Sequence, residues 1–88
     1  MIVNEYTILA ADGLHARPAT ALVKLAKNYK SAISLKKDEK VVNLNSLLNI
    51  LSLGLKGGEI IAVIVDGEDE TSAAEAIDIF FKEQLKEL

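Results

Sequence analysis

The sequence contains no cysteine and no tryptophan, and it has only one proline and one histidine. Without cysteine, the chain can form neither a disulfide nor a zinc-thiolate site, and it has no thiol redox chemistry. One histidine cannot supply a multi-histidine metal site. We therefore expect no metal ion and no cofactor.

Long apolar runs and a surplus of positive charge are also missing. No hydrophobic stretch approaches the roughly 20 residues that span a bilayer, and residues 1–5 lack the basic start of a signal peptide. The net charge of −3 argues against a nucleic-acid partner, because phosphate backbones attract an excess of lysine and arginine. The 88 residues fit a single domain, residues 1–88. We expect a cytoplasmic monomer that does not insert into a membrane.

The one histidine and the one proline occur together in residues 13–19, Gly-Leu-His-Ala-Arg-Pro-Ala. Pro18 is typical of the first turn of a helix, where its missing N–H needs no partner and its φ is already helical. This predicts His15 at the N-cap or next to it. A helix N-terminus presents free N–H donors and a partial positive charge, so a negatively charged group is favoured there.

The spacing of apolar residues predicts the elements of the fold. Strands are expected at residues 2–10, 32–37, 40–44 and 60–65, and helices at 16–29, at 47–53 and from Asp69 or Ser72 to residue 88. The resulting order, β-α-β-β-α-β-α, favours an α+β fold. We expect an open-faced β-sandwich, in which a layer of helices covers one face of a four-stranded sheet.

Two details of the strands follow from their residue types. Asp38-Glu39 is short enough to form a hairpin, and Glu39 is an unusual turn residue because tight hairpins favour glycine or asparagine where φ is positive. Residues 60–65 form a continuous apolar run, which is typical of an interior strand.

His15 has the chemistry of a phosphoryl acceptor. Neutral imidazole attacks phosphorus readily, and a large fraction of ordinary histidine is neutral near pH 7. The helix N-terminus and the guanidinium of Arg17 would then bind the oxygens of the transferred group. From chemistry alone, a capping or turn histidine beside a surface arginine is the alternative interpretation.

Residues 13–19 resemble the active-site motif of HPr, the histidine-containing phosphocarrier family of the bacterial sugar phosphotransferase system. The resemblance covers the whole chain, through its length, its element order and the segments at residues 43–46, 52–54 and 67–70. It implies a four-stranded antiparallel sheet with three helices on one face. It also implies a stoichiometric carrier rather than an enzyme: His15 takes a phosphoryl group on Nδ1 from phospho-Enzyme I and passes it to the A domains of sugar permeases, and Arg17 stabilises the phosphate.

Ser46 resembles the regulatory serine of that family, which an ATP-dependent HPr kinase phosphorylates in many Gram-positive relatives. The resemblance thus adds HPr kinase/phosphorylase and a transcriptional regulator to the expected partners. A phosphate at a helix N-cap is electrostatically favourable and adds about −1.5 to −2 charges. The alternative is a plain N-cap serine worth about 1 kcal/mol.

A docking surface for protein partners is predicted on the first two helices. Arg17 and Lys24 lie on nearly one face of the first helix, with Lys27 about 60° away. The second helix is apolar nearly all round, so some of its leucines should stay exposed and form an apolar patch rimmed by positive charge. The alternative is a solvated helix face beside ordinary core leucines. The residues predicted to contact partners are Thr20, Lys24, Lys27, Leu47, Leu48 and Leu51.

Two other functions remain open at this point. One is a regulatory or nitrogen-branch relative of the same family with little part in sugar uptake. The other is a non-catalytic α+β module that binds a small ligand or RNA, although the acidic net charge disfavours RNA.

Overall fold

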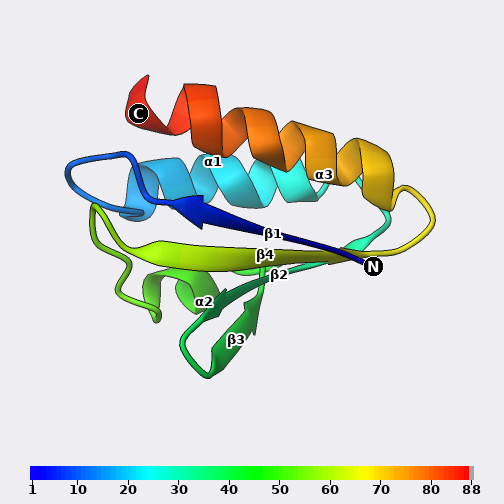
Figure 1. The fold of residues 1–88 in the computed structure, drawn as a ribbon, viewed down its shortest axis with the longest axis horizontal. Helices are drawn as coiled ribbons and strands as arrows, with labels where there is room; N and C mark the ends of the chain where they lie inside the picture. The colour runs from blue at the N-terminus through cyan, green and yellow to red at the C-terminus, as the bar shows by residue number, and fades with distance from the viewer. Residues whose placement is uncertain (88) are drawn as a thin grey trace.

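The computed structural model describes residues 1–87 of the chain (Figure 1). Its strands are β1 (Ile2–Thr7), β2 (Ala32–Lys37), β3 (Lys40–Asn43) and β4 (Ile60–Asp66). Its helices are α1 (Ala16–Ala26), α2 (Leu47–Leu51) and α3 (Glu70–Ile79), and α3 continues through a π-helical turn at Phe80–Gln84 and a 3₁₀ turn at Leu85–Glu87. The predicted order of elements is confirmed.

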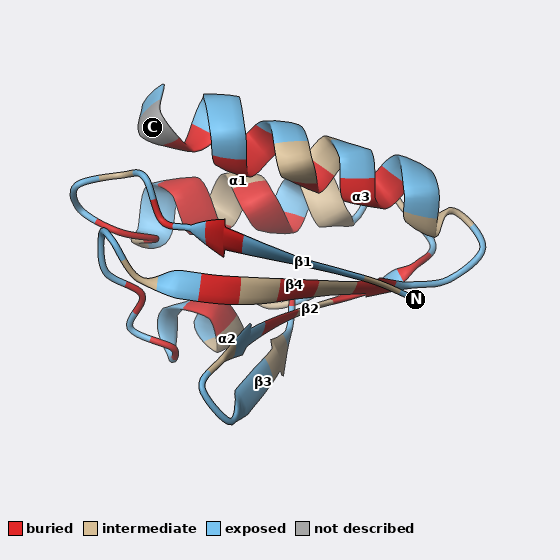
Figure 2. Ribbon diagram, in the orientation of Figure 1, coloured by how far each residue is buried: buried red, intermediate tan, exposed pale blue. Residues whose placement is uncertain are grey.

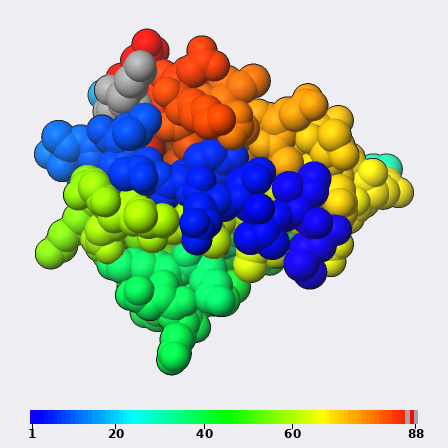
Figure 3. Space-filling view, viewed as in Figure 1, coloured from blue at the N-terminus to red at the C-terminus, as the bar shows by residue number. Residues whose placement is uncertain are grey.

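The strands form one antiparallel sheet in the order β1-β4-β2-β3. β4 lies between β1 and β2, which confirms that the apolar run at residues 60–65 is an interior strand. β1 is an edge strand, and it pairs with β4 from Ile2 opposite Val65 to Thr7 opposite Ile60. In Figure 3 the dark blue N-terminal segment crosses the front of the molecule below the orange α3.

The helices lie on one face of the sheet. α1 and α3 run side by side over it, and α2 packs beside α1 and β3 (Figure 1). Figure 2 shows that buried segments alternate with exposed ones along both α1 and α3, as expected for helices with one covered side. The spacing of Ala19, Leu22, Val23 and Ala26 predicts one buried face for α1, and the first three are buried while Ala26 is half-buried.

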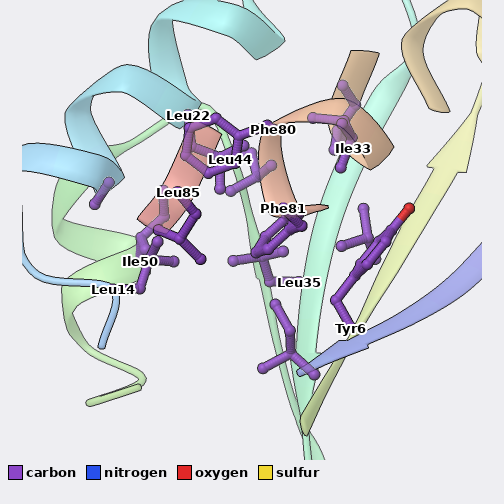
Figure 4. Close-up of a cluster of buried hydrophobic side chains, with 14 of the residues drawn as sticks. Tyr6, Leu14, Leu22, Ile33, Leu35, Leu44, Ile50, Phe80, Phe81 and Leu85 are labelled. Atoms are coloured by element: carbon purple, nitrogen blue, oxygen red, sulfur yellow. The ribbon is translucent and has the colours of Figure 1, made fainter. Parts of the chain in front are cut away.

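Aromatic side chains pack the edge strand β1 against the helical turn that follows α3 (Figure 4). Tyr6 of β1 stacks on Phe81, with ring centroids 4.8 Å apart, and Phe80 meets Phe81 edge to face at 5.4 Å. The Tyr6 hydroxyl donates a hydrogen bond of 2.9 Å to Oδ1 of Asp78. Burial, with the Asp78 hydrogen bond as a second cause, raises the pKa of Tyr6 to about 12.

The two-residue turn between β2 and β3 takes its left-handed residue at Asp38, whose φ is 56°. The flanking residues Lys37 and Lys40 pair with each other, so the predicted hairpin is confirmed. Glu39 does not have a positive φ. The left-handed conformation falls on the first turn residue, where aspartate tolerates it better than most side chains do.

Several elements end earlier than predicted. α1 ends at Ala26 instead of residue 29, because the N–H of Tyr29 bonds to the Ala26 carbonyl at 3.2 Å in a tightened turn. α2 ends at Leu51 instead of residue 53, and the N–H of Gly54 likewise bonds to the Leu51 carbonyl at 3.1 Å. β1 and β3 end at residues 7 and 43 instead of 10 and 44. The predicted end of the last helix, residue 88, lies outside the described residues.

Asp69 occupies the N-cap of α3, the earlier of the two predicted starts, but its side chain does not cap the helix. Its carboxylate accepts hydrogen bonds from the Ser31 hydroxyl at 2.5 Å, the Ser31 N–H at 2.9 Å and the Lys30 N–H at 2.8 Å. These bonds, the Ser31 hydroxyl foremost, hold the pKa of Asp69 below its ordinary value of 3.8. The start of α3 is thus tied to the segment that enters β2.

Candidate functional site

The loop that carries His15 packs against the loop between α2 and β4. The N–H of Leu14 donates to the carbonyl of Leu55 at 3.1 Å. Gly13 has a φ of 71°, and a Cβ at this position would lie 2.7 Å from the Cα of Lys56 and would overlap the Leu55 carbonyl oxygen. Only glycine fits this close approach, so Gly13 fixes the path of the chain into His15.

His15 is the N-cap of α1, as Pro18 predicted. Its backbone is extended, with φ −81° and ψ −171°, and its carbonyl accepts the N–H of Ala19 at 3.0 Å. The imidazole makes no capping hydrogen bond and is partly exposed. The side chain is therefore available for chemistry, and the capping interpretation lacks the hydrogen bond on which it depends.

The N-terminus of α1 is an uncompensated positive end. Its first turn contains no acidic residue, and the first two N–H groups, those of Ala16 and Arg17, have no intrahelical partner. Arg17 is exposed and makes no ion pair with any acidic residue that the structure describes. His15 is thus followed directly by two unpaired backbone N–H groups and by an arginine in the first turn, a set of groups that suits a phosphoryl group.

The charged neighbours of this site do not form a metal centre. Among residues 1–87 no group of three or more histidine, cysteine, aspartate and glutamate side chains is placed to hold a metal ion. Within the same range no helix has the length and apolar character needed to cross a bilayer.

Ser46 is the N-cap of α2, with φ −140° and ψ 129°, and its hydroxyl makes no capping hydrogen bond. The turn before it is instead shaped by asparagines: the Asn43 side chain accepts the N–H of Asn45 at 2.9 Å, and Asn49 donates to the Asn43 carbonyl at 3.2 Å. Ser46 is partly exposed. The hydroxyl is therefore not engaged in the role that the plain N-cap interpretation gives it.

The predicted docking residues lie on two helices that pack against each other. Leu48 is 76% exposed and Leu51 is 37% exposed, while Leu47 is half-buried. Lys24 and Lys27 of α1 are exposed. Thr20 is half-buried, and its hydroxyl donates to the Ala16 carbonyl at 2.7 Å. Exposed leucines on α2 and exposed lysines on α1 therefore occupy neighbouring elements.

His15 and Ser46 lie toward opposite ends of α1. Lys27, just beyond the last turn of α1, lines the same hollow as Asn45, the residue before Ser46. The other end of α1 begins at His15, next to the loop that follows α2. An 11-residue helix is about 16 Å long, so a charge on one site would act on the other mainly through a shared partner.

The loop between α2 and β4 is the part of the site that the sequence did not reveal. Besides the Leu55 carbonyl, this loop places Gly57 so close to the Ala10 carbonyl oxygen that a Cβ would lie 2.6 Å from it. Gly58 has a φ of 88°. The run of glycines was the available signal, since such residues mark close backbone approach. Lys56, which is exposed, borders the histidine loop as a further cation.

Comparison with known proteins agrees with this geometry. The sequence model of the family described as the PTS HPr component phosphorylation site matches residues 2–83. The phosphocarrier protein HPr of Lysinibacillus sphaericus is 42% identical over 77 residues, which is 88% of this chain and 88% of that protein. The chain therefore belongs to the HPr family.

Solved structures of relatives show the same fold. HPr from Thermoanaerobacter tengcongensis superposes with a TM-score of 0.92 at 34% identity, over 97% of this chain and 96% of that one. A histidine-containing phosphocarrier protein from Mycoplasma superposes with a TM-score of 0.90 at 33% identity, over 97% of both chains. The predicted HPr-like architecture, a four-stranded antiparallel open sheet with three helices, is confirmed.

Proposed function

We propose that this chain is a phosphoryl carrier that accepts a phosphoryl group from phospho-Enzyme I on His15 and donates it to the A domains of sugar permeases. The observation that carries the proposal is the unengaged imidazole at the N-cap of α1, beside free N–H groups and the exposed Arg17, in a chain of the HPr family. These partners act in the cytoplasm, where we place the protein.

The transfer needs little beyond position and charge. The lone pair of Nδ1 attacks phosphorus, a P–N bond forms, and the bond between phosphorus and the donor group breaks with its electron pair staying on the donor. The N–H groups at the start of α1 and the guanidinium of Arg17 stabilise the phosphoryl oxygens during and after transfer. The second transfer reverses these steps, with the permease domain as acceptor.

The docking surface serves a carrier that binds and leaves each partner. The exposed leucines of α2 and the lysines of α1 suit an acidic partner with an apolar groove. A carrier must dissociate after one transfer, so binding is weak and fast. The chain is used stoichiometrically and does not turn over a substrate as an enzyme does.

Ser46 is the proposed regulatory site, phosphorylated by HPr kinase/phosphorylase and then recognised by a transcriptional regulator. Its support is the partly exposed hydroxyl that makes no capping hydrogen bond. A phosphate there adds about −1.5 to −2 charges at the edge of the docking surface, which opposes docking of an acidic partner.

A phosphotransfer assay tests both proposals. The protein is incubated with Enzyme I and labelled phosphoenolpyruvate, and in parallel with an HPr kinase and labelled ATP. We expect acid-labile label on His15 in the first reaction, lost in His15→Ala, and acid-stable label on Ser46 in the second, lost in Ser46→Ala. Label that survives in His15→Ala would refute the carrier.

The same assay separates the rival functions. A nitrogen-branch relative accepts label from the Enzyme I of that branch in preference to the sugar-branch enzyme. A non-catalytic binding module accepts none, and its ligand binding is unchanged in His15→Ala.

A further inference from the structure

The segment between β1 and α1 contacts the loop between α2 and β4 at both of its ends. At its start, the N–H of Ile8 donates to the carbonyl of Glu59 at 2.8 Å. At its end, the N–H of Leu14 donates to the carbonyl of Leu55 at 3.1 Å. Figure 1 shows the two segments side by side, one after β1 and the other before β4. The conformation of the loop between α2 and β4 therefore determines where the chain enters His15.

The Glu59 side chain stabilises this loop through two contacts. Its Oε1 accepts the N–H of Lys56 at 2.9 Å, and its Oε2 forms an ion pair of 2.5 Å with Nζ of Lys37. The Lys37 side chain is 25% exposed and that of Glu59 is 28% exposed, so water and salt screen the pair less than a fully exposed one. The contact with Lys37, followed by the Lys56 hydrogen bond, holds the pKa of Glu59 below its ordinary value of 4.5.

The ammonium group of Lys37 connects the two ends of the same loop. Lys37 is the last residue of β2, and its Nζ contacts the Glu59 carboxylate just before β4. Nζ also donates a hydrogen bond of 3.4 Å to the carbonyl of Leu53, soon after α2. The loop is rich in glycine, whose backbone has a wide choice of conformations. A cation from the neighbouring hairpin thus restricts a loop that would otherwise be free to move.

We propose that Lys37 and Glu59 are positioning residues for phosphoryl transfer, because their ion pair fixes the loop that determines the place of His15. The inference rests on the proposed role of His15 as the phosphoryl acceptor. Among the hydrogen bonds and ion pairs of residues 1–87, neither side chain contacts His15, so the pair acts through the bond between Leu14 and Leu55. Nδ1 must approach phosphorus at a narrow range of distances and directions, so a small displacement of the loop lowers the rate.

The Lys37–Glu59 pair lies outside the predicted docking surface, whose residues belong to α1 and α2. Lys37 does contact the chain just after α2, but Lys40 donates a further hydrogen bond there, to the Ser52 carbonyl at 3.4 Å. This bond remains when Lys37 is replaced. Loss of the pair should therefore slow transfer within the complex and leave the affinity for Enzyme I unchanged.

Amide hydrogen exchange of the unphosphorylated protein tests the structural step. In Lys37→Met the N–H of Leu14 should exchange roughly fivefold faster than in the wild type, because the loop opens more often. Glu59→Ala should exchange at least as fast, since the N–H of Lys56 also loses its acceptor. The amides in the middle of α3 should exchange at the wild-type rate in both variants. Circular dichroism establishes that each variant is folded.

Steady-state phosphorylation by Enzyme I, at a series of concentrations of this chain, tests the functional step. In Lys37→Met we expect kcat to fall by roughly threefold or more with KM unchanged. Lys37→Arg keeps the cation and should restore kcat. The double variant Lys37→Met/Glu59→Ala should be no slower than Glu59→Ala alone, because both substitutions remove the same pair.

Lys36→Met is the matched control. It removes the same charge from the adjacent position of β2, where the side chain is exposed and forms no ion pair within the described part of the chain. Its exchange at Leu14 and its kcat should equal those of the wild type.

Four results would overturn the proposal. One is an unchanged kcat in Lys37→Met, and another is a change confined to KM, which would assign Lys37 to docking. The others are multiplied effects in the double variant and an exchange rate at Leu14 that no variant alters. A wild type that accepts no label refutes the proposed function, and the role in transfer with it. Exchange at Leu14 involves no phosphoryl group, so it still decides whether the pair fixes the loop.

Discussion

The N-cap side chains of α1 and α3 are used in different ways. Asp69, the N-cap of α3, gives its carboxylate to three hydrogen bonds with Lys30 and Ser31. His15, the N-cap of α1, gives its imidazole to no capping bond. Asp69 therefore links the start of α3 to the segment before β2, whereas the His15 side chain stays free to react. A cap position can thus serve either the fold or the chemistry.

The two helix starts also differ in the charge of their first turns. α3 carries Glu70 in its first turn, and the Glu70 side chain accepts the N–H of Gly67 at 3.2 Å. Its positive end is therefore compensated from within the chain. α1 has no acidic residue in its first turn, so its positive end remains for an external anion. Substitutions at the two starts should accordingly separate stability from phosphoryl transfer.

The largest expected effect is on transfer, in His15→Ala. This variant should lose phosphoryl acceptance from Enzyme I completely, because no other imidazole exists in the chain. Its free energy of unfolding should change by less than about 0.5 kcal/mol, since a partly exposed side chain without a capping bond is removed. Transfer assays and urea unfolding measure the two quantities. A large loss of stability would show that the imidazole supports the fold after all.

The next largest effect is expected in Gly13→Ala, which disturbs the approach to His15. The new Cβ must occupy the space of Leu55 and Lys56 backbone atoms, and the left-handed φ of 71° adds a further penalty. We expect a loss of about 3 kcal/mol in unfolding free energy together with slower transfer. Gly54→Ala is the control, because Gly54 also has a positive φ, 58°, but has no atom within 4 Å of a new Cβ. It should lose only about 1 kcal/mol.

Asp69→Ala should have the opposite effect to His15→Ala: it should lower the stability of the fold and leave phosphoryl transfer intact. It leaves the N–H groups of Lys30 and Ser31 without their acceptor, and we expect the melting temperature to fall by roughly 10 °C. Transfer to the folded variant should remain near the wild-type rate. Glu75→Ala, an exposed carboxylate in the same helix, is the control and should melt near the wild-type temperature. Thermal unfolding by circular dichroism, with transfer assays at low temperature, makes the comparison.

Acid should weaken the Asp69 connection in a predictable range of pH. The pKa of Asp69 is lowered in the folded protein, chiefly by the Ser31 hydroxyl. Its contribution to stability is therefore complete well above its ordinary value of 3.8 and is lost as the pH falls below that value toward the folded pKa. In Asp69→Asn this part of the pH dependence should be absent. Unfolding free energies measured from neutral to acidic pH check it, and equal slopes in both proteins would contradict it.

The smallest effect is expected in Ser46→Ala. An N-cap serine usually contributes about 1 kcal/mol, but the Ser46 hydroxyl makes no capping bond. We expect a change of only a few tenths of a kcal/mol in unfolding free energy, measured by urea titration. A loss near 1 kcal/mol would restore the plain capping role.

Local patterns in the sequence predicted much of the fold. The order of elements, the interior position of β4 and the buried face of α1 all follow from the spacing of apolar residues, which depends only on neighbouring positions. Pro18 correctly placed the N-cap at His15. The predicted ends of α1 and α2 were too late, because the last turn of each helix tightens. Backbone hydrogen bonds determine this tightening, and the periodicity of the side chains does not indicate it.

Contacts between distant segments could not be predicted in this way. Two hydrogen bonds join residues that lie more than 35 positions apart. One runs from Ser31 to the Asp69 carboxylate, and the other from the N–H of Leu14, in the histidine loop, to the carbonyl of Leu55. The same holds for Glu5, Ala62 and Lys36, which become neighbours only once β1, β4 and β2 are paired. Sequence patterns indicated which residues are special, while the alignment of segments determined what they touch.

Because the N–H of Leu14 bonds to the carbonyl of Leu55, the position of His15, the proposed phosphoryl acceptor, depends on the length of the loop between α2 and β4. Adding or deleting one residue between α2 and β4 would shift that carbonyl and move His15 without changing any residue of residues 13–19. Natural variation in this family should therefore conserve the length of that connection more strictly than its side chains. A change in the length of this loop should therefore reduce phosphoryl transfer while leaving residues 13–19 unchanged.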